Sequence, residues 1–193
     1  MARQSSSPNI IEIIHDVAKI RDLYTGLLNH AATEIMLMIP TDNALERDKN
    51  SGVIQMLRNR SANHGIKVRI LSPAKVISFH DDSSHRGVNK ALSDKTSTRR
   101  YTNFQTRLIA QTIGQEQRST ILIVDRKFSL IMELKDDSEE DFMEAIGTSI
   151  YSNSKATVSS YASIFENLWH QSELYEQIIL ANEHLEENQK KFF

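Results

Sequence analysis

The sequence contains no cysteine, only three prolines and six glycines in 193 residues, and no long apolar run. The absence of cysteine excludes disulfides, thiolate metal ligands and a cysteine nucleophile, and it fits a reducing compartment. The longest apolar runs, such as residues 35–39 and 121–124, are far shorter than the roughly 20 residues of a membrane-spanning helix. Residues 1–7 do not resemble a secretory signal. We therefore expect a cytoplasmic protein without a membrane partner.

The sequence also lacks an excess of positive charge. It has 23 basic and 25 acidic residues and a net charge of −2, whereas nucleic-acid-binding domains normally carry a basic excess or stripe. Common phosphate-loop, dinucleotide, zinc-protease and hydrolase motifs are absent as well. One cluster that contains His80 and His85 lies in a stretch without periodicity, which is a poor setting for a metal site. We predict no metal, no cofactor and no nucleic-acid partner for this region.

Apolar spacing in the first third of the chain predicts a strand, a helix and a second strand after an initial helix. The initial helix is predicted from Ser7 and Pro8 to about Ala31, and residues 35–39 form a dense apolar run typical of a strand buried on both faces. A helix from Ala44, ended by Gly65, leads to a strand over residues 66–71. Lys67 and Arg69 alternate there with apolar residues, which indicates a strand nearer an edge of the sheet or one with a partly solvated face. This order predicts a right-handed βαβ unit with parallel strands.

The remaining two thirds of the chain predict further strands and one long helix. Residues 72–98 read as a loop, residues 108–117 fit either a strand or a helix, and the acidic residues 136–141 read as a solvated loop or a helix start. Strands are expected at residues 100–104, 119–124, 128–134 and 145–151, with residues 125–127 as a tight hairpin connection. The fold class is therefore α/β, with a mixed sheet flanked by helices.

From Lys155 to Phe193 the chain has neither glycine nor proline, which permits a single long helix. Its first half has a broad apolar face that suits packing on the sheet, and its second half narrows to a heptad seam. We predict a sensor domain over residues 1–170 and a coiled-coil signalling helix over residues 171–193 that forms a homodimer. A solvent-exposed helix that frays remains the alternative. The predicted dimerisation residues are Tyr175, Ile178, Asn182, Leu185 and Phe192.

Three segments together resemble a known family: residues 39–71, residues 119–125, and residues 150–153 leading into residues 165–169. Their order is similar to the phospholipase D-like fold, and more closely to its degenerate copies in archaeal sensor histidine kinases and in sugar-sensing archaeal transcription regulators. The resemblance covers residues 10 to 175. It implies a mixed sheet flanked by helices, followed by a long C-terminal signalling helix.

The catalytic members of this family carry the motif His-x-Lys-x-x-x-x-Asp. At the matching positions this sequence has Arg118, Thr120 and Asp125, so only the aspartate is retained. Arginine does not act as a nucleophile or general acid near neutral pH, and threonine has no charge with which to hold a phosphate. The resemblance therefore implies the fold, and the substitutions lead us to predict that this region is not an enzyme.

In this family the pocket lies at the C-terminal ends of the central strands, where open α/β sheets generally bind ligands. The polar residues that we place near such a pocket, for an unknown small-molecule ligand, are Thr41, Asn43, Arg118, Thr120, Asp125 and Asn153. Local roles remain open for several of them: Thr41 and Asn153 as caps, Asp125 as a turn residue and Arg118 as a surface charge.

The function predicted first is that of a sensor or input domain of a signal-transduction protein, with a histidine kinase as the expected effector. The exit helix would pass the signal on, because a packed pair of helices has a few discrete arrangements. The alternative is the effector-binding domain of a transcription regulator. The third hypothesis is a phosphodiesterase that acts across a dimer interface.

Overall fold

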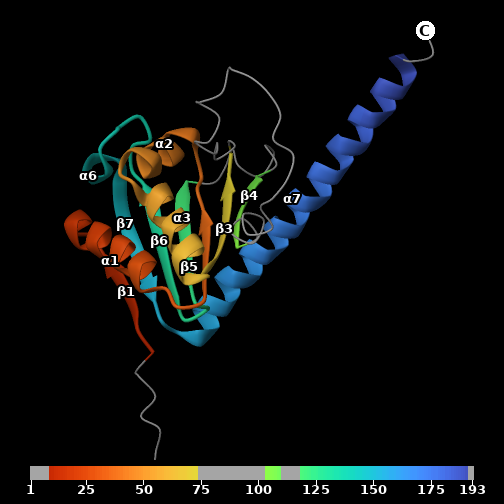
Figure 1. The fold of residues 1–193 in the computed structure, drawn as a ribbon. Coiled ribbons are helices and arrows are strands. Elements are labelled where there is room, and N and C mark those ends of the chain that lie inside the picture. Colours follow the sequence, from red (N-terminus) through yellow and green to blue (C-terminus); the bar gives the residue numbers. More distant parts are fainter. Residues whose placement is uncertain (1–8, 74–102, 110–117, 191–193) are drawn as a thin grey trace, which may run out of the picture.

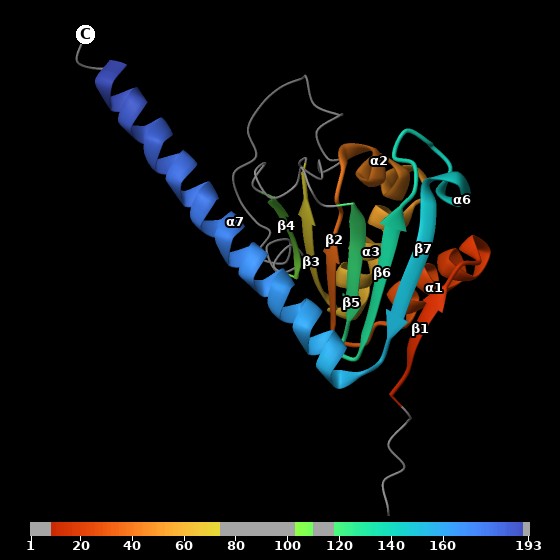
Figure 2. The same ribbon diagram turned by 180° about the vertical axis from the view of Figure 1, so that it is seen from behind.

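The computed structural model describes residues 9–73, 103–109 and 118–190, with the side chains of the last helix described up to Ile178. A mixed sheet of seven strands forms the centre, in the order β1-β7-β6-β5-β2-β3-β4. One long helix crosses one face of the sheet, and the other helices cover the opposite face (Figures 1 and 2). This is the predicted fold class.

The bounds of the elements are as follows. The strands are β1 (Ile11–Ile14), β2 (Glu34–Met38), β3 (Lys67–Ser72), β4 (Phe104–Leu108), β5 (Ser119–Val124), β6 (Phe128–Leu134) and β7 (Ile146–Ser152). The helices are α1 (Val17–His30), α2 (Asp42–Asn50), α3 (Val53–His64), α6 (Phe142–Ala145) and α7 (Lys155–Lys190).

The central strands β2 and β5 are mostly apolar because both faces of the sheet are covered. On β2, Ile35 and Leu37 belong to the core beneath α1, α2 and α3, whereas Met36 and Met38 belong to the core beneath α7. Alternate residues of a strand point to opposite faces, so a short apolar run can serve both cores. The prediction of a strand buried on both faces is confirmed.

The predicted βαβ unit is present, because β2 and β3 pair in parallel. Two helices, α2 and α3, make the crossover in place of the single one that was expected. Gly52 separates them with a φ of 81°, and Gly65 ends α3 with a φ of 67°; both lie in the left-handed region that favours glycine. The hairpin of β5 and β6 and the last strand were also predicted correctly.

The prediction of a helix that starts at residue 8 is wrong. Residues Ile11–Ile14 form the edge strand β1, which pairs antiparallel with β7. The helix begins only at Val17, because the Asp16 carboxylate accepts hydrogen bonds from the N–H groups of Ala18 and Lys19 and so caps it. A strand of four residues is too short to show a clear period in the sequence, and its pairing partner lies about 140 residues away.

The long C-terminal helix is confirmed as α7, which has 36 residues. Within its first half, Val158, Phe165 and Trp169 are buried, whereas Ile164 is exposed. The helix continues through residue 170 without a break. The division into a sensor domain and a signalling helix stays a prediction. Among the described residues, no helix has the length and apolar character needed to cross a membrane.

Candidate functional site

The six polar residues proposed from the sequence fall at opposite ends of the sheet. Because β5 runs antiparallel to β2, the start of β5 lies beside the end of β2, and the turn after β5 lies beside the start of β2. Thr41, Asn43, Arg118 and Thr120 are thus at one end. The turn residue Asp125 is at the other end. Asn153 is also there, because β7 runs antiparallel to β6 and ends beside the start of β6. The expectation that all six share one pocket is corrected by this topology, and ligand binding by any of them stays a prediction.

At the first end, Thr41 and Asn43 hold the acidic loop that follows β6. The Thr41 hydroxyl caps α2 by accepting from the Ala44 N–H at 3.0 Å, and it donates to the Asp137 carboxylate at 2.8 Å. Asn43 donates to the Asp137 carbonyl at 3.0 Å, and the buried Arg47 forms an ion pair of 2.8 Å with the Asp137 carboxylate. The capping role left open for Thr41 is confirmed. The prediction of a solvated loop or a helix start over residues 136–141 is also confirmed, because all of them except the half-buried Asp137 are exposed and Asp141 caps α6.

The two residues at the motif positions of β5 have different surroundings. Thr120 is buried, on the face of the strand that it shares with Leu122. Arg118 is exposed, and its carbonyl accepts a hydrogen bond of 2.9 Å from the Leu134 N–H. The cluster with His80 and His85 lies outside the described residues. Among the described ones, no group of three histidine, aspartate or glutamate side chains is placed to hold a metal ion.

Asp125, the residue retained from the motif, ties the β5–β6 turn to the loop before β2. Its carboxylate accepts hydrogen bonds from the N–H groups of Ala32, Thr33 and Glu34 at 2.7–3.1 Å and from the Thr33 hydroxyl at 2.8 Å. Partial burial raises the pKa of this carboxyl, but the N–H donors and the hydroxyl outweigh burial and lower the pKa below its ordinary value. The alternative of a turn residue is confirmed.

Asn153 joins β1 to the end of β7. Its side-chain oxygen accepts from the Ile10 N–H at 2.6 Å, and its own N–H donates to the Ile10 carbonyl at 3.1 Å. The first hydrogen bond of α7 runs from the Val158 N–H to the Ser154 carbonyl. Asn153 therefore extends a strand ladder in place of capping the helix.

Replacing Asp125 by alanine should lower the free energy of unfolding by about 1–2 kcal/mol, because the N–H groups that it binds lose their acceptor. The backbone adds to the cost, because Asp125 has a φ of 53° and alanine tolerates that region less well. Asp125→Asn keeps one acceptor oxygen and tolerates this φ, so its loss should be smaller. Urea unfolding of the three proteins near neutral pH measures the difference, and equal stability of all three would contradict the capping role.

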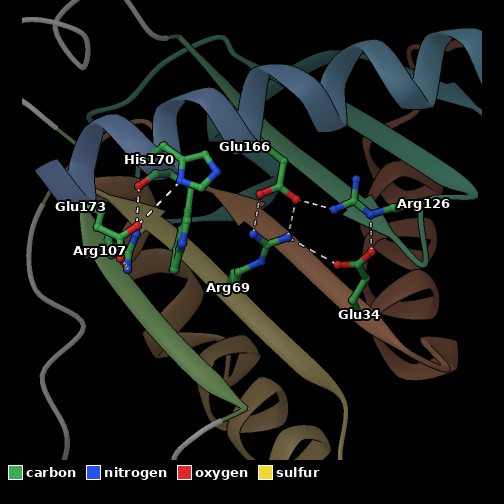
Figure 3. A network of polar contacts seen from close by, with 8 residues as sticks. Glu34, Arg69, Arg107, Arg126, Glu166, His170 and Glu173 are labelled. Atoms are coloured by element: carbon green, nitrogen blue, oxygen red, sulfur yellow. Dashed lines mark hydrogen bonds and ion pairs between the residues drawn. The ribbon is translucent and has the colours of Figure 1, made fainter.

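A network of ion pairs that the sequence analysis did not predict joins α7 to the sheet (Figure 3). Arg69 of β3 donates both terminal nitrogens to the Glu166 carboxylate of α7, at 2.7 and 2.8 Å, and lies 3.5 Å from the Glu34 carboxylate of β2. Arg126 of the hairpin turn binds Glu34 at 2.6 Å and also pairs with Glu166. Two guanidinium groups thus face two carboxylates, and the network links α7 to β2, β3 and the β5–β6 turn.

Aromatic rings of α7 cover this network and extend it to β4. The Arg69 guanidinium lies over the rings of Phe165 and Trp169, at 5.4 and 5.5 Å from their centroids. Arg107 of β4 lies 4.4 Å from the Trp169 centroid, donates to the Trp169 carbonyl at 3.0 Å and pairs with Glu173 at 2.9 Å. Each contact is a cation–π or charge-assisted interaction between a strand and α7.

The network keeps its carboxylate on α7 ionised. Hydrogen bonds from Arg69, followed by those from Arg126, lower the pKa of Glu166 to about 2 despite its partial burial. Arg69 is only 5% exposed, although its alternation with Lys67 predicted a partly solvated face. The predicted position near an edge is confirmed, because β3 lies next to the edge strand β4. Lys67 is exposed, but α7, almost 100 residues later in the sequence, covers Arg69.

A second polar group that the sequence analysis missed is a buried pair between α1 and α2. The Tyr24 hydroxyl donates to the Asp48 carboxylate at 3.1 Å, and the Tyr24 ring stacks on Phe142 of α6 at 6.2 Å. Burial raises the pKa of Asp48 to about 7, although the Tyr24 hydrogen bond and Arg47 act to lower it. The sequence held one signal for this pair: Asp48 lies four and three residues after Ala44 and Leu45, which are buried on the same face of α2.

The sequence matches no protein-family model and no curated protein. Three solved structures are similar in fold. NucT from Helicobacter pylori has a TM-score of 0.51 at 15% identity, over 84% of this chain and 97% of its own. Nuc from Salmonella typhimurium, a phospholipase D family member, has a TM-score of 0.50 at 13% identity, over 85% and 96%. TrmBL2, an archaeal chromatin protein with a novel mode of DNA binding, has a TM-score of 0.50 at 13% identity.

The match to TrmBL2 covers 88% of this chain and 56% of TrmBL2, so this chain spans little more than half of that protein. At these identities the likeness establishes the fold, which is phospholipase D-like as the sequence resemblance implied. The comparison overturns one prediction. NucT and Nuc have the fold of a family of enzymes, which contradicts the expectation that this region is not an enzyme.

Proposed function

We propose that this phospholipase D-like domain is the input domain of a cytoplasmic signal-transduction protein, in which α7 passes the state of the domain to an effector such as a histidine kinase core. The observation that carries the proposal is the form of α7. Its 36 residues give a length of about 54 Å. The first half lies on the sheet and the second half extends beyond it (Figures 1 and 2).

The anchored half of α7 is suited to respond to changes in the sheet. Glu166 is held from β3 by Arg69 and from the hairpin turn by Arg126, and the Trp169 carbonyl is held from β4 by Arg107. A shift of any of these elements changes the contacts of α7 directly. Packed helices and sheets move between discrete arrangements, so such a shift can turn or slide a helix as a unit.

The extending half of α7 carries apolar side chains without cover. Tyr175 is 44% exposed and Ile178 is 58% exposed, and both lie on the heptad seam. Large apolar side chains in such a seam favour a partner helix, so we propose a homodimer through α7. Of the other predicted seam residues, Asn182 and Leu185 lie within α7, where only the backbone is described, and Phe192 lies outside the described residues. Their role stays a prediction.

Ile178→Glu should weaken dimerisation about tenfold or more, because a carboxylate in the seam loses apolar burial and faces its own copy. Gln177→Glu adds the same charge at an exposed position outside the seam and should leave the dimer intact. Sedimentation equilibrium of both variants and the natural sequence measures the change. A chain that is monomeric before substitution, or an Ile178→Glu protein that dimerises as tightly as the control, would contradict the role of α7.

Two other functions are each favoured by one observation. The fold shared with TrmBL2 favours the effector-binding domain of a transcription regulator. The reading frame around this region distinguishes the regulator from the signalling protein. A kinase core encoded next to this region would support signalling, and a helix-turn-helix segment would support a transcription regulator. The fold shared with Nuc favours a phosphodiesterase. Turnover of bis(p-nitrophenyl) phosphate that is lost in Arg118→Ala would support it; Asp125 is unsuitable for this test because it holds the β2 loop.

A further inference from the structure

The free edge of the sheet at β1 is apolar and uncovered among the described residues. β1 is the last strand on its side and pairs only with β7. Ile11 is 63% exposed and Ile13 is 60% exposed. Natural edge strands are usually protected by charges, prolines, bulges or a covering segment. The opposite edge strand, β4, is held under α7 by Arg107, whereas no described element covers β1.

The main-chain groups of Ile11 and Ile13 point outward from this edge. Ile10 is a hydrogen-bonded partner of Asn153, because the Asn153 N–H donates to the Ile10 carbonyl. Residues of an antiparallel strand alternate in the side to which their N–H and C=O groups point. Glu12 and Ile14 therefore face β7 like Ile10, and Ile11 and Ile13 present both groups to the free edge.

Ile13 is also the end of an apolar row that crosses four strands. The register places Ile121, Ile131, Ile150 and Ile13 side by side on β5, β6, β7 and β1. Ile121 is buried under α7, Ile131 and Ile150 are half-buried, and Ile13 is exposed. The solvent exposure of these side chains thus increases from β5 toward the edge strand β1.

We propose that β1 pairs with β1 of a second copy, antiparallel about a twofold axis at Glu12, so that the two sheets become continuous. In this register Ile11 of each copy lies opposite Ile13 of the other, and both exchange their outward main-chain hydrogen bonds. The four isoleucines form one apolar cluster that continues the row. The partner is a second copy because this register matches the strand to itself, which a twofold interface requires.

The register also accounts for the one charge on the strand. Glu12 lies opposite Glu12 of the partner subunit, and like charges opposite each other normally weaken a strand pair. Lys19 of α1 binds the Glu12 carboxylate at 2.6 Å and so neutralises it within each copy. β1 and the extending half of α7 lie toward opposite edges of the sheet (Figure 1), so the β1 contact leaves the extending half of α7 accessible.

A cysteine at position 12 tests this contact directly, since the natural sequence has none. The paired residues at the axis are not hydrogen-bonded to each other, which brings their Cβ atoms to about 4.5–5.5 Å, within reach of a disulfide. The 193-residue chain with Glu12→Cys should form a disulfide-linked dimer under mild oxidation. Asp22→Cys, exposed on α1, is the control and should remain largely uncrosslinked.

The added substitutions Ile11→Lys and Ile13→Lys should abolish crosslinking of Glu12→Cys, because they charge both exposed positions of the edge. Carrying out the comparison in the Ile178→Glu background separates this contact from α7, since crosslinking at position 12 should persist there. Circular dichroism of each variant confirms folding. The proposal is overturned if Glu12→Cys crosslinks no more than Asp22→Cys, or if the two lysines leave its crosslinking unchanged.

Discussion

Replacing Asp48 by asparagine should raise the free energy of unfolding by about 4 kcal/mol near pH 8 and change it little near pH 4. The reason is the buried carboxyl, whose pKa is raised to about 7 from the ordinary 3.8. Above pH 7 the natural protein must hold a buried carboxylate, with one hydrogen bond from Tyr24 and Arg47 nearby. Asparagine keeps the shape and an acceptor for the Tyr24 hydroxyl without the charge.

The raised pKa of Asp48 also sets the direction in which the stability of the natural protein changes with pH. Because the folded protein holds a proton that the unfolded chain loses near pH 3.8, this contribution to stability is complete below that pH. It is lost as the pH rises through about 7. Urea unfolding between pH 4 and pH 8 measures the decline, and Asp48→Asn should flatten it. The carboxyls whose pKa is lowered, among them those of Asp125 and Glu166, act in a separate window at lower pH.

Asp42→Asn is the matched control for this experiment, because Asp42 is an exposed residue of the same helix. Its profile should follow that of the natural protein to within about 0.5 kcal/mol. A natural protein whose stability rises from pH 5 to pH 8, or an Asp48→Asn protein with the same slope as the control, would contradict the assigned role of Asp48.

Replacing Glu166 by glutamine should lower the free energy of unfolding by about 2–3 kcal/mol and loosen the first half of α7. Arg69 would keep only the longer contact with Glu34, and a buried guanidinium without its main partner is costly. The pKa of Glu166 is lowered to about 2 from 4.5, so its contribution is complete above pH 4.5 and is lost as the pH falls through 2. The difference between the variant and the natural protein should therefore shrink in acid.

Hydrogen exchange along α7 tests where this effect acts. The amides of Glu166 and its neighbours should exchange faster in Glu166→Gln, because the ion pairs that fix this part of the helix to β3 are weakened. Glu173→Gln is the control, since Glu173 is more exposed and its ion-pair partners among the described residues are Arg107 and His170; its loss of stability should be clearly smaller, because exposed ion pairs contribute little. Equal effects of the two substitutions would show that the network does not hold α7.

Much of the fold could be predicted because its signals are local. The apolar run of residues 35–39, the glycine at position 65 and the glycine-free stretch after Lys155 each gave the correct element. The retained Asp125 was assigned to a pocket through the family resemblance, although its place in a tight hairpin turn was a local sign of its structural role. The order of motifs thus predicted the fold correctly, but it did not predict the roles of single residues such as Asp125.

By itself, the sequence determined the strands β2, β3, β5, β6 and β7, the long helix α7 and the phospholipase D-like order of elements, because periodicity and turn residues act over a few positions. Only the tertiary structure decided that Arg69 is buried, that Asp48 lies between α1 and α2, and that β1 ends as an open apolar edge. Each of these depends on what packs against a residue from about 20 to 140 positions away. The contribution of a charged or apolar side chain to the free energy of folding depends on the neighbour that packs against it, and local sequence does not specify that neighbour.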